Sequence, residues 1–106
     1  MGFKTVMGGP VTGSVRIDEK VLQALEAYAA IAPAHNPPYI QAIRIFQQLL
    51  PATPLVAVFE TSFHRTLPER AFLYGIPYEW YEQYGVRRYG FHGASHRYVS
   101  ERVARI

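Results

Sequence analysis

Glu60 and three histidines stand where the sequence predicts junctions between secondary-structure elements. Glu60 directly follows the apolar run 55–59, and His64 comes four residues later. His92 precedes the last predicted helix, whose free N–H groups would favour an anion, and His35 lies between two earlier helices. A carboxylate and histidines in such places suit acid–base catalysis, stabilisation of phosphate charge or metal binding. For each residue taken singly, a surface or capping role is the commoner outcome.

Two other patterns near the C-terminus do not support a metal or nucleic-acid site. His92 and His96 have i, i+4 spacing, but Gly93 stands where the zinc-protease motif requires a glutamate. The run 87–91 fits part of the RNA-recognition strand motif, and the match fails at positions 88, 92 and 94. The chain also has no glycine-rich phosphate loop that ends in Lys-Ser or Lys-Thr. We therefore expect no metal site and no nucleic-acid partner.

The composition is that of one small globular domain. Of the 106 residues, 49% are hydrophobic and 18% are charged, and 11 basic against 8 acidic side chains give a net charge of +3. The absence of cysteine excludes a disulfide scaffold, a cysteine-ligated zinc site and a thiol nucleophile. No apolar run reaches the ~18–20 residues of a membrane span, and no signal-peptide pattern opens the chain. We therefore expect a cytoplasmic protein that does not enter a membrane.

Strands that alternate with helices predict an α/β sheet. Residues 3–6 are expected to form a strand, and residues 11–17 a second strand or an extended connection. Residues 55–59 are apolar without alternation, which is typical of a central parallel strand covered on both faces. Residues 86–91 are expected to form a further strand. Ligands of such sheets bind at the carboxyl ends of the strands, where the candidates that follow residues 59 and 91 lie.

Two helices are expected in the first half of the chain. Asp18 is a good N-cap for a helix that ends at Pro33. Asn36 is expected to cap the next helix, over residues 38–50, because a proline follows it at the first helical position. The apolar residues of this second helix lie on more than one face, which predicts that it is mostly buried.

Three shorter helices are expected in the second half. Thr66 and Glu69 have the spacing of a capping box, which predicts a short helix that stops at Gly75. Residues 77–84 are expected to form another helical turn or two. A last helix is expected over residues 96–106, after a turn at residues 92–95.

Two long motifs resemble the acetate kinase family. They are residues 56–68 (VAVFETSFHRTLP) and residues 87–99 (RRYGFHGASHRYV), and stretches 31–38 and 74–81 match the same family in the same order. The resemblance covers essentially the whole chain. It implies that residues 1–106 are one partial domain, an internal segment of the acid-binding domain, without the nucleotide-binding domain or the N-terminal phosphate turn. The implied fold class is α/β, a partial actin/sugar-kinase/heat-shock-protein-like (ribonuclease H-like) domain with an incomplete sheet flanked by helices.

The resemblance also assigns roles to individual residues. It implies that His35 and His92 are catalytic and stabilise the transferring phosphoryl group, and that His96 supports the same phosphate site. Glu60 stands at the position of the catalytic aspartate of the family. The resemblance implies that Lys4 binds the carboxylate of the substrate acid. It also implies that the methyl group of the acid is bound by Val6, Ala34 and Phe91.

Four positions of the chain depart from the family pattern. Glu60 is one methylene longer than aspartate, and a misplacement of ~1 Å can reduce the rate on the order of a hundredfold. Lys4 replaces an arginine and loses its bidentate fork. Met7 stands where the family has a histidine, and Ala34 replaces the usual leucine, which widens the acid pocket.

The family transfers the γ-phosphoryl group of ATP to acetate or a similar short carboxylic acid, with magnesium. ATP and Mg²⁺ are cofactors of the parent family, and we expect neither to bind tightly to this chain alone, which is therefore expected to be inactive by itself. Two alternatives remain open. One is a module that binds phosphate or a small carboxylate through His35 and His92. The other is a structural remnant whose exposed apolar faces pair with another copy of the chain.

Overall fold

The computed structural model describes residues 1–106 and contains one three-stranded sheet in the order β1–β3–β2. Strands β1 (Gly2–Thr5) and β3 (Val56–Phe59) run parallel, and β2 (Ser14–Arg16) pairs antiparallel with β3. The expected strands at 3–6 and 55–59 are confirmed, and within 11–17 only three residues are strand. The expected cover on both faces of β3 is wrong. Val58 is 46% exposed, because the core packs only against the opposite face of the sheet.

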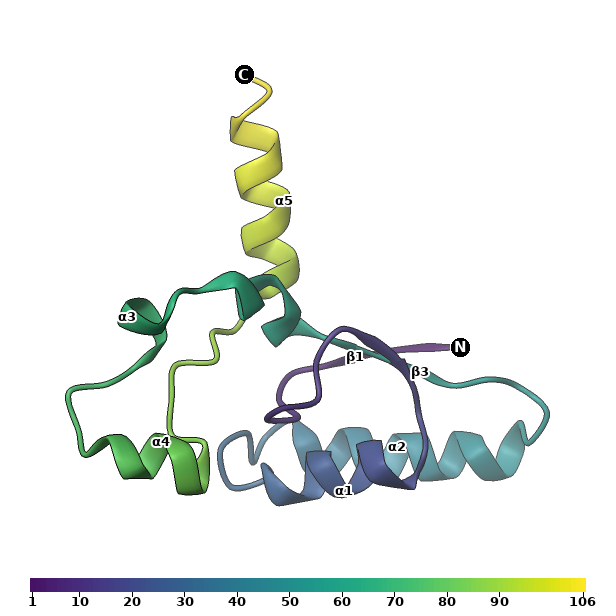
Figure 1. The fold of residues 1–106 in the computed structure, drawn as a ribbon. Helices are drawn as coiled ribbons and strands as arrows, with labels where there is room; N and C mark the ends of the chain where they lie inside the picture. Colours follow the sequence, from purple (N-terminus) through teal and green to yellow (C-terminus); the bar gives the residue numbers. More distant parts are fainter.

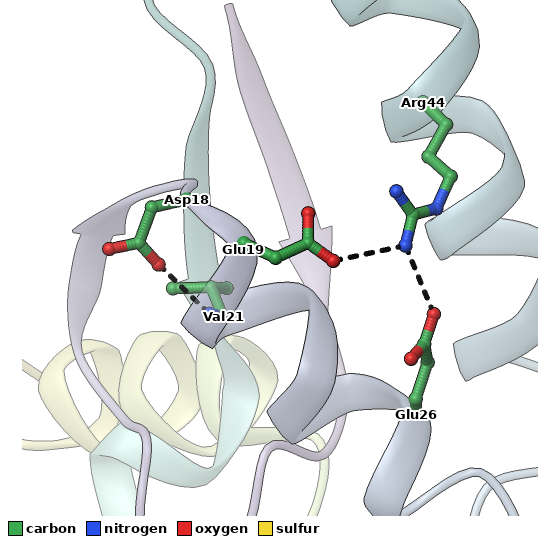
Figure 2. Close-up of polar contacts among 5 residues, drawn as sticks. All are labelled: Asp18, Glu19, Val21, Glu26 and Arg44. Atoms are coloured by element: carbon green, nitrogen blue, oxygen red, sulfur yellow. Dashed lines mark hydrogen bonds and ion pairs between the residues drawn. The ribbon is translucent and has the colours of Figure 1, made fainter.

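Helix α1 (Glu19–Ala27) begins as the sequence predicts. The Asp18 carboxylate accepts a hydrogen bond of 2.9 Å from the backbone N–H of Val21, which is the expected N-cap (Figure 2). The helix ends at Ala27, well before the proline that was expected to end it, and turns fill the chain to residue 35.

Helix α2 (Asn36–Leu49) lies beside α1, and the two are joined on their exposed side by one arginine (Figures 1 and 2). The Arg44 Nη2 donates to the carboxylates of Glu19 and Glu26 at 3.3 and 3.2 Å. These hydrogen bonds, first that to Glu26 and then that to Glu19, raise the pKa of Arg44. The pairs are exposed, so they contribute little to stability.

Two expectations for α2 are wrong. The helix is not mostly buried, because Ile40 and Ile43 face the core whereas Leu49 is 68% exposed. Asn36 does not act as the N-cap either. His35 occupies the cap position without a side-chain hydrogen bond, and Asn36 is fully buried inside the first turn.

The main core lies between the sheet and helices α1 and α2. Nine buried apolar side chains form it: Ile17, Val21, Leu22, Leu25, Ile40, Ile43, Leu55, Ala57 and Phe59. A smaller cluster of Val6, Met7 and Ala32 lies beyond the carboxyl end of β1. Helices α1 and α2 thus cover one face of the sheet.

A 3₁₀ helix, η1 (Glu60–Thr66), follows β3 directly, and α3 (Glu69–Phe72) and α4 (Tyr78–Tyr84) come after it. The helix expected over 77–84 is confirmed. The expected capping box is wrong, because α3 begins after Pro68 without a side-chain cap. The Glu69 carboxylate accepts a hydrogen bond of 3.2 Å from the Tyr78 hydroxyl instead, which raises the pKa of Tyr78.

The strand expected over 86–91 is wrong. This stretch forms no strand, and its Arg88 N–H donates to the carbonyl of Phe72, the last residue of α3. Helix α5 (Gly93–Val103) then begins three residues earlier than expected and projects away from α1 and α2 (Figure 1). Its apolar residues, among them Val99 and Val103, are exposed. None of the helices combines the length and the apolar character of a membrane span.

Candidate functional site

A buried carboxylate paired with a lysine lies at the carboxyl edge of the sheet. Glu60 follows the last residue of β3 and is 7% exposed. Lys4 lies on β1 opposite Val58, and its Nζ is 3.1 Å from Glu60 Oε1. The Lys4 side chain is 65% exposed, so the cation reaches the carboxylate from solvent. The structure therefore brings together two of the predicted site residues.

The turn that carries Glu60 is fixed by a serine that the sequence analysis did not single out. The Ser62 hydroxyl donates to the Phe59 carbonyl at 2.6 Å and accepts from the Gly13 N–H at 2.7 Å. It thereby joins the end of β3 to the loop before β2. Serine tends to bond to nearby backbone just beyond a strand, and this tendency was the available signal.

The predicted residues Phe91, His92 and His96 cluster at the start of α5. His64 Nε2 donates to the Phe91 carbonyl at 2.9 Å. His92 is the exposed N-cap of α5, and the His96 ring stacks on Phe63 with centroids 6.4 Å apart. Helix α5 packs on η1, because Gly93 touches the Glu60 carbonyl so closely that no Cβ fits between them. Glu60 and His92 thus sit on adjoining elements.

The predicted residues from the α1–α2 connection lie apart from this cluster. His35 and Ala34 are exposed, and the ring contact of His35 is with Tyr39 on its own helix, at 6.3 Å. Val6 is buried in the small cluster with Met7. No hydrogen bond, ion pair or ring contact joins His35 to the Glu60 carboxylate. The structure therefore assembles one part of the predicted site and leaves His35 at its periphery.

Three cavities surround these residues. One of about 760 Å³ lies between Lys4, Glu60 and the first turns of α5. A second, of about 620 Å³, lies on the other side of η1 and is lined by His64 and Tyr89. A third, of about 370 Å³, includes Phe91 in its wall. Neither His35 nor His92 lines any of the three.

A tyrosine that the sequence analysis did not single out connects the second and third cavities. The Tyr89 hydroxyl donates to the Gly85 carbonyl at 2.8 Å and lies 3.5 Å from the Tyr28 hydroxyl. Burial, and then the contact with Tyr28, raise the pKa of Tyr89 above its ordinary range. Its hydroxyl therefore stays protonated and serves as a hydrogen-bond donor. Gly85 is only four residues away, whereas the contact with Tyr28, 61 residues away, could not be inferred from the local sequence.

The site holds one carboxylate and several nitrogen donors but no ready-made metal cage. No group of three or more His, Asp or Glu side chains is arranged to bind a metal ion. The Lys4 ammonium compensates the buried Glu60 carboxylate and, because it is largely exposed, is also open to an anion from solvent. Phosphoryl transfer and carboxylate binding both require positive charge close to the anionic group.

Comparisons with known proteins agree on one family. A family model described as the Acetokinase family matches residues 1–106. The acetate kinases of Fervidobacterium nodosum and Geobacter sulfurreducens are 57% and 58% identical to the chain, over 100% and 98% of it. The propionate kinase of Francisella tularensis superposes with a TM-score of 0.86 at 46% identity over 96% of the chain. The acetate kinase of Porphyromonas gingivalis gives 0.81 at 42% identity over 98%.

The chain spans only about a quarter of the length of these relatives, 26% and 25% of the two acetate kinase sequences and 27% and 26% of the two solved chains. The TM-scores of 0.86 and 0.81 show that the chain has the same fold as the corresponding parts of these two kinases. The expected fold class, an α/β part of an actin-like kinase domain with an incomplete sheet, is confirmed.

Proposed function

Because the chain belongs to the acetokinase family, we propose that it forms an acid-binding part of an enzyme that phosphorylates a short carboxylic acid. The phosphoryl donor in this proposal is ATP, and the acid is acetate or a close homologue such as propionate. The observation that carries the proposal is the buried Glu60 carboxylate, held by the Lys4 ammonium at the carboxyl edge of the sheet. Ligands of α/β sheets bind at this edge.

Lys4 and Glu60 divide the work of handling negative charge. The exposed Lys4 side chain is able to leave Glu60 and bind the carboxylate of the acid. One oxygen of that carboxylate then attacks the γ-phosphorus of ATP, and ADP leaves with the electron pair of the broken bond. Such reactions are accelerated almost entirely by positioning and charge stabilisation, so Glu60 acts by fixing charge and orientation rather than by covalent chemistry.

The remaining site residues are proposed to surround the reacting groups. His92 lies on the element that adjoins Glu60, which supports a role in stabilising the transferring phosphoryl group, with His96 one turn further along α5. His35 would contribute from the start of α2. The proposed pocket for the methyl group of the acid is apolar and consists of Val6, Ala34 and Phe91.

Magnesium would be held on this segment by Glu60 alone. Mg²⁺ commonly binds through one or two carboxylates and completes its shell with water and substrate phosphates, which fits a site that offers one buried carboxylate. When bound, the ion neutralises charge on the phosphates. Residues 1–106 hold no group of three or more His, Asp or Glu side chains arranged for a metal ion, and Glu101, which lines the same cavity as Glu60, is paired with Arg97.

A segment exchange tests this function directly. The 106 residues replace the corresponding quarter of the Fervidobacterium nodosum acetate kinase, and ADP release is measured with ATP, Mg²⁺ and acetate or propionate. We expect acid-dependent turnover in the chimaera, and none from the 106-residue chain alone. Glu60→Gln should reduce kcat at least ~100-fold, and the matched variant Glu60→Asp should retain activity. A folded chimaera that is inactive both unchanged and with the Glu60→Asp substitution would refute the proposal.

Self-association is a second candidate function, favoured by the exposed apolar side chains of α2 and α5. Leu49 of α2 is 68% exposed and Val103 of α5 is 64% exposed. Such patches commonly mark contacts with other polypeptide. Multi-angle light scattering over a concentration series tests it. A dimer that Val103→Ser dissociates would support it, and a monomer at every concentration would contradict it.

A further inference from the structure

The turn 90–92, which leads into α5, has a backbone conformation that ordinary residues avoid. Gly90 has a φ of 77° and His92 a φ of 55°, and His92 is the only residue other than glycine with a positive φ. Residues in this region persist where surrounding contacts hold them, and they cluster at functional sites. Phe91 lies between the two. The contacts that hold this turn therefore decide where Phe91 and His92 lie.

His64 supplies those contacts. Its Nε2 lies 2.9 Å from the carbonyl oxygen of Phe91. A carbonyl only accepts, so Nε2 carries the proton and donates it. The His64 ring also lies flat against Gly90, and a Cβ at position 90 would clash with the ring atoms Cγ and Cδ2. One side chain thus fixes the turn both by a hydrogen bond and by a contact that only glycine permits.

His64 is itself fixed relative to Glu60. Both belong to η1, which begins directly at the end of β3. The other side of η1 is held by α5, since Gly93 contacts the Glu60 carbonyl and the His96 ring lies 5.4 Å from the His64 ring. Glu60 and the turn 90–92 are therefore connected through one short helix, η1, which packs against α5.

We propose that His64 is a positioning residue, whose Nε2–H holds the Phe91 carbonyl and thereby fixes the turn 90–92 relative to Glu60. The hydrogen bond and its effect on the turn do not depend on the proposed function; only the effect on catalysis rests on it. His64 acts through Phe91 and His92 rather than on the reacting groups. A displacement of ~1 Å between these residues and Glu60 reduces the rate on the order of a hundredfold.

Two variants of His64 separate the hydrogen bond from the bulk of the ring. His64→Leu keeps an apolar side chain of moderate size and removes the donor. His64→Gln keeps an N–H at nearly the position of Nε2. Thr66→Ala is the matched control, because Thr66 is exposed at the end of the same 3₁₀ helix.

The structural measurement uses nuclear magnetic resonance on the 106-residue chain. We expect the His64 side chain as the tautomer protonated at Nε2, and a ¹³C shift of the Phe91 carbonyl that His64→Leu changes and His64→Gln restores. A bare Nε2 would overturn the proposal, as would a Phe91 shift that is the same in all variants. If His64→Leu does not fold, His64→Gln decides, and loss of the Phe91 shift in that variant overturns the proposal.

The kinetic measurement uses the chimaera with the Fervidobacterium nodosum enzyme. His64→Leu should lower kcat/KM for acetate about 100-fold, through both a lower kcat and a higher KM, because Phe91 and His92 move together. His64→Gln should remain within about tenfold of the unchanged chimaera, and Thr66→Ala should equal it. A merely structural role would lower the active fraction and leave KM unchanged, and that result would overturn the proposal. An inactive unchanged chimaera would refute the proposed function instead, and the resonance experiment would still decide on His64.

Discussion

Replacing Asn36 by alanine should destabilise the fold by about 2 kcal/mol. The Asn36 Nδ2 donates to the carbonyls of Met7 and Leu25 at 2.7 and 2.9 Å, and the side chain is fully buried. It therefore satisfies one carbonyl at the end of α1 and ties that helix to the segment after β1. Each hydrogen bond contributes about 1 kcal/mol net, and each buried carbonyl left unpaired costs about 1–3 kcal/mol.

The net loss is at the lower end of this range for a structural reason. The Asn36 Oδ1 is already buried without a partner, so alanine also removes one unsatisfied atom. At about 4–8 °C per kcal/mol for a domain of this size, Tm should fall by roughly 10 °C.

Urea unfolding followed by circular dichroism measures the effect. Gln41→Ala is the control, because Gln41 is exposed on the same helix. Asn36→Asp has the same shape but places an oxygen toward the two carbonyls, so it should be at least as destabilising as alanine. A change below about 0.5 kcal/mol for Asn36→Ala, or a fully stable Asn36→Asp, would refute the reasoning.

Three further predictions concern the site and its supports. The pKa of Tyr89 is raised in the folded state, so the contribution of Tyr89 to the unfolding free energy should be constant below pH ~10 and fall above it, as the unfolded chain loses the proton. Urea titrations at rising pH should therefore show a shallower fall above pH ~10 in Tyr89→Phe. Gly93→Ala should displace α5 from Glu60, seen as faster amide exchange in α5, whereas Gly75→Ala should change nothing because its Cβ would enter open space. Lys4→Met should cost about 1 kcal/mol in urea unfolding by leaving the buried Glu60 carboxylate unpaired, and an unchanged midpoint would contradict that pairing.

Where local signals and tertiary contacts agree, the sequence was sufficient. The Asp18 cap and the strand 56–59 form as expected, because a capping carboxylate and an apolar run need little help from distant residues. Asn36 shows the limit. Its cap signal is genuine, but its Nδ2 donates to two carbonyls of other segments, and the Oδ1 that would cap the helix has no partner. Sequence spacing cannot reveal partners that lie 11 and 29 residues away.

The stretch 86–91 failed for a related reason. Its aromatic and apolar residues are typical of a strand, yet they pack against other elements, as the Tyr89 ring does against the Tyr28 ring, with centroids 6.0 Å apart. The positive φ of Gly90 then turns the chain toward His64. For the site, the sequence located Glu60 and His92 at element ends, whereas the roles of Ser62 and Tyr89 depend on the folded arrangement.

The apolar residues of α2 and α5 are the last place where the hydrophobic pattern of the sequence and the burial in the structure disagree. Hydrophobic residues are 49% of the chain, yet only 19 of 106 residues are buried. The radius of gyration is 15.3 Å, whereas a compact chain of this length has about 13 Å. The exposed apolar residues of α2 and α5 have the pattern of buried residues, yet no other part of residues 1–106 covers them. At the site, Lys4 and Glu60 meet because β1 pairs with β3 and Glu60 directly follows β3. The start of α2 is held to the segment after β1 through Asn36, and the His35 ring stays exposed beside Tyr39.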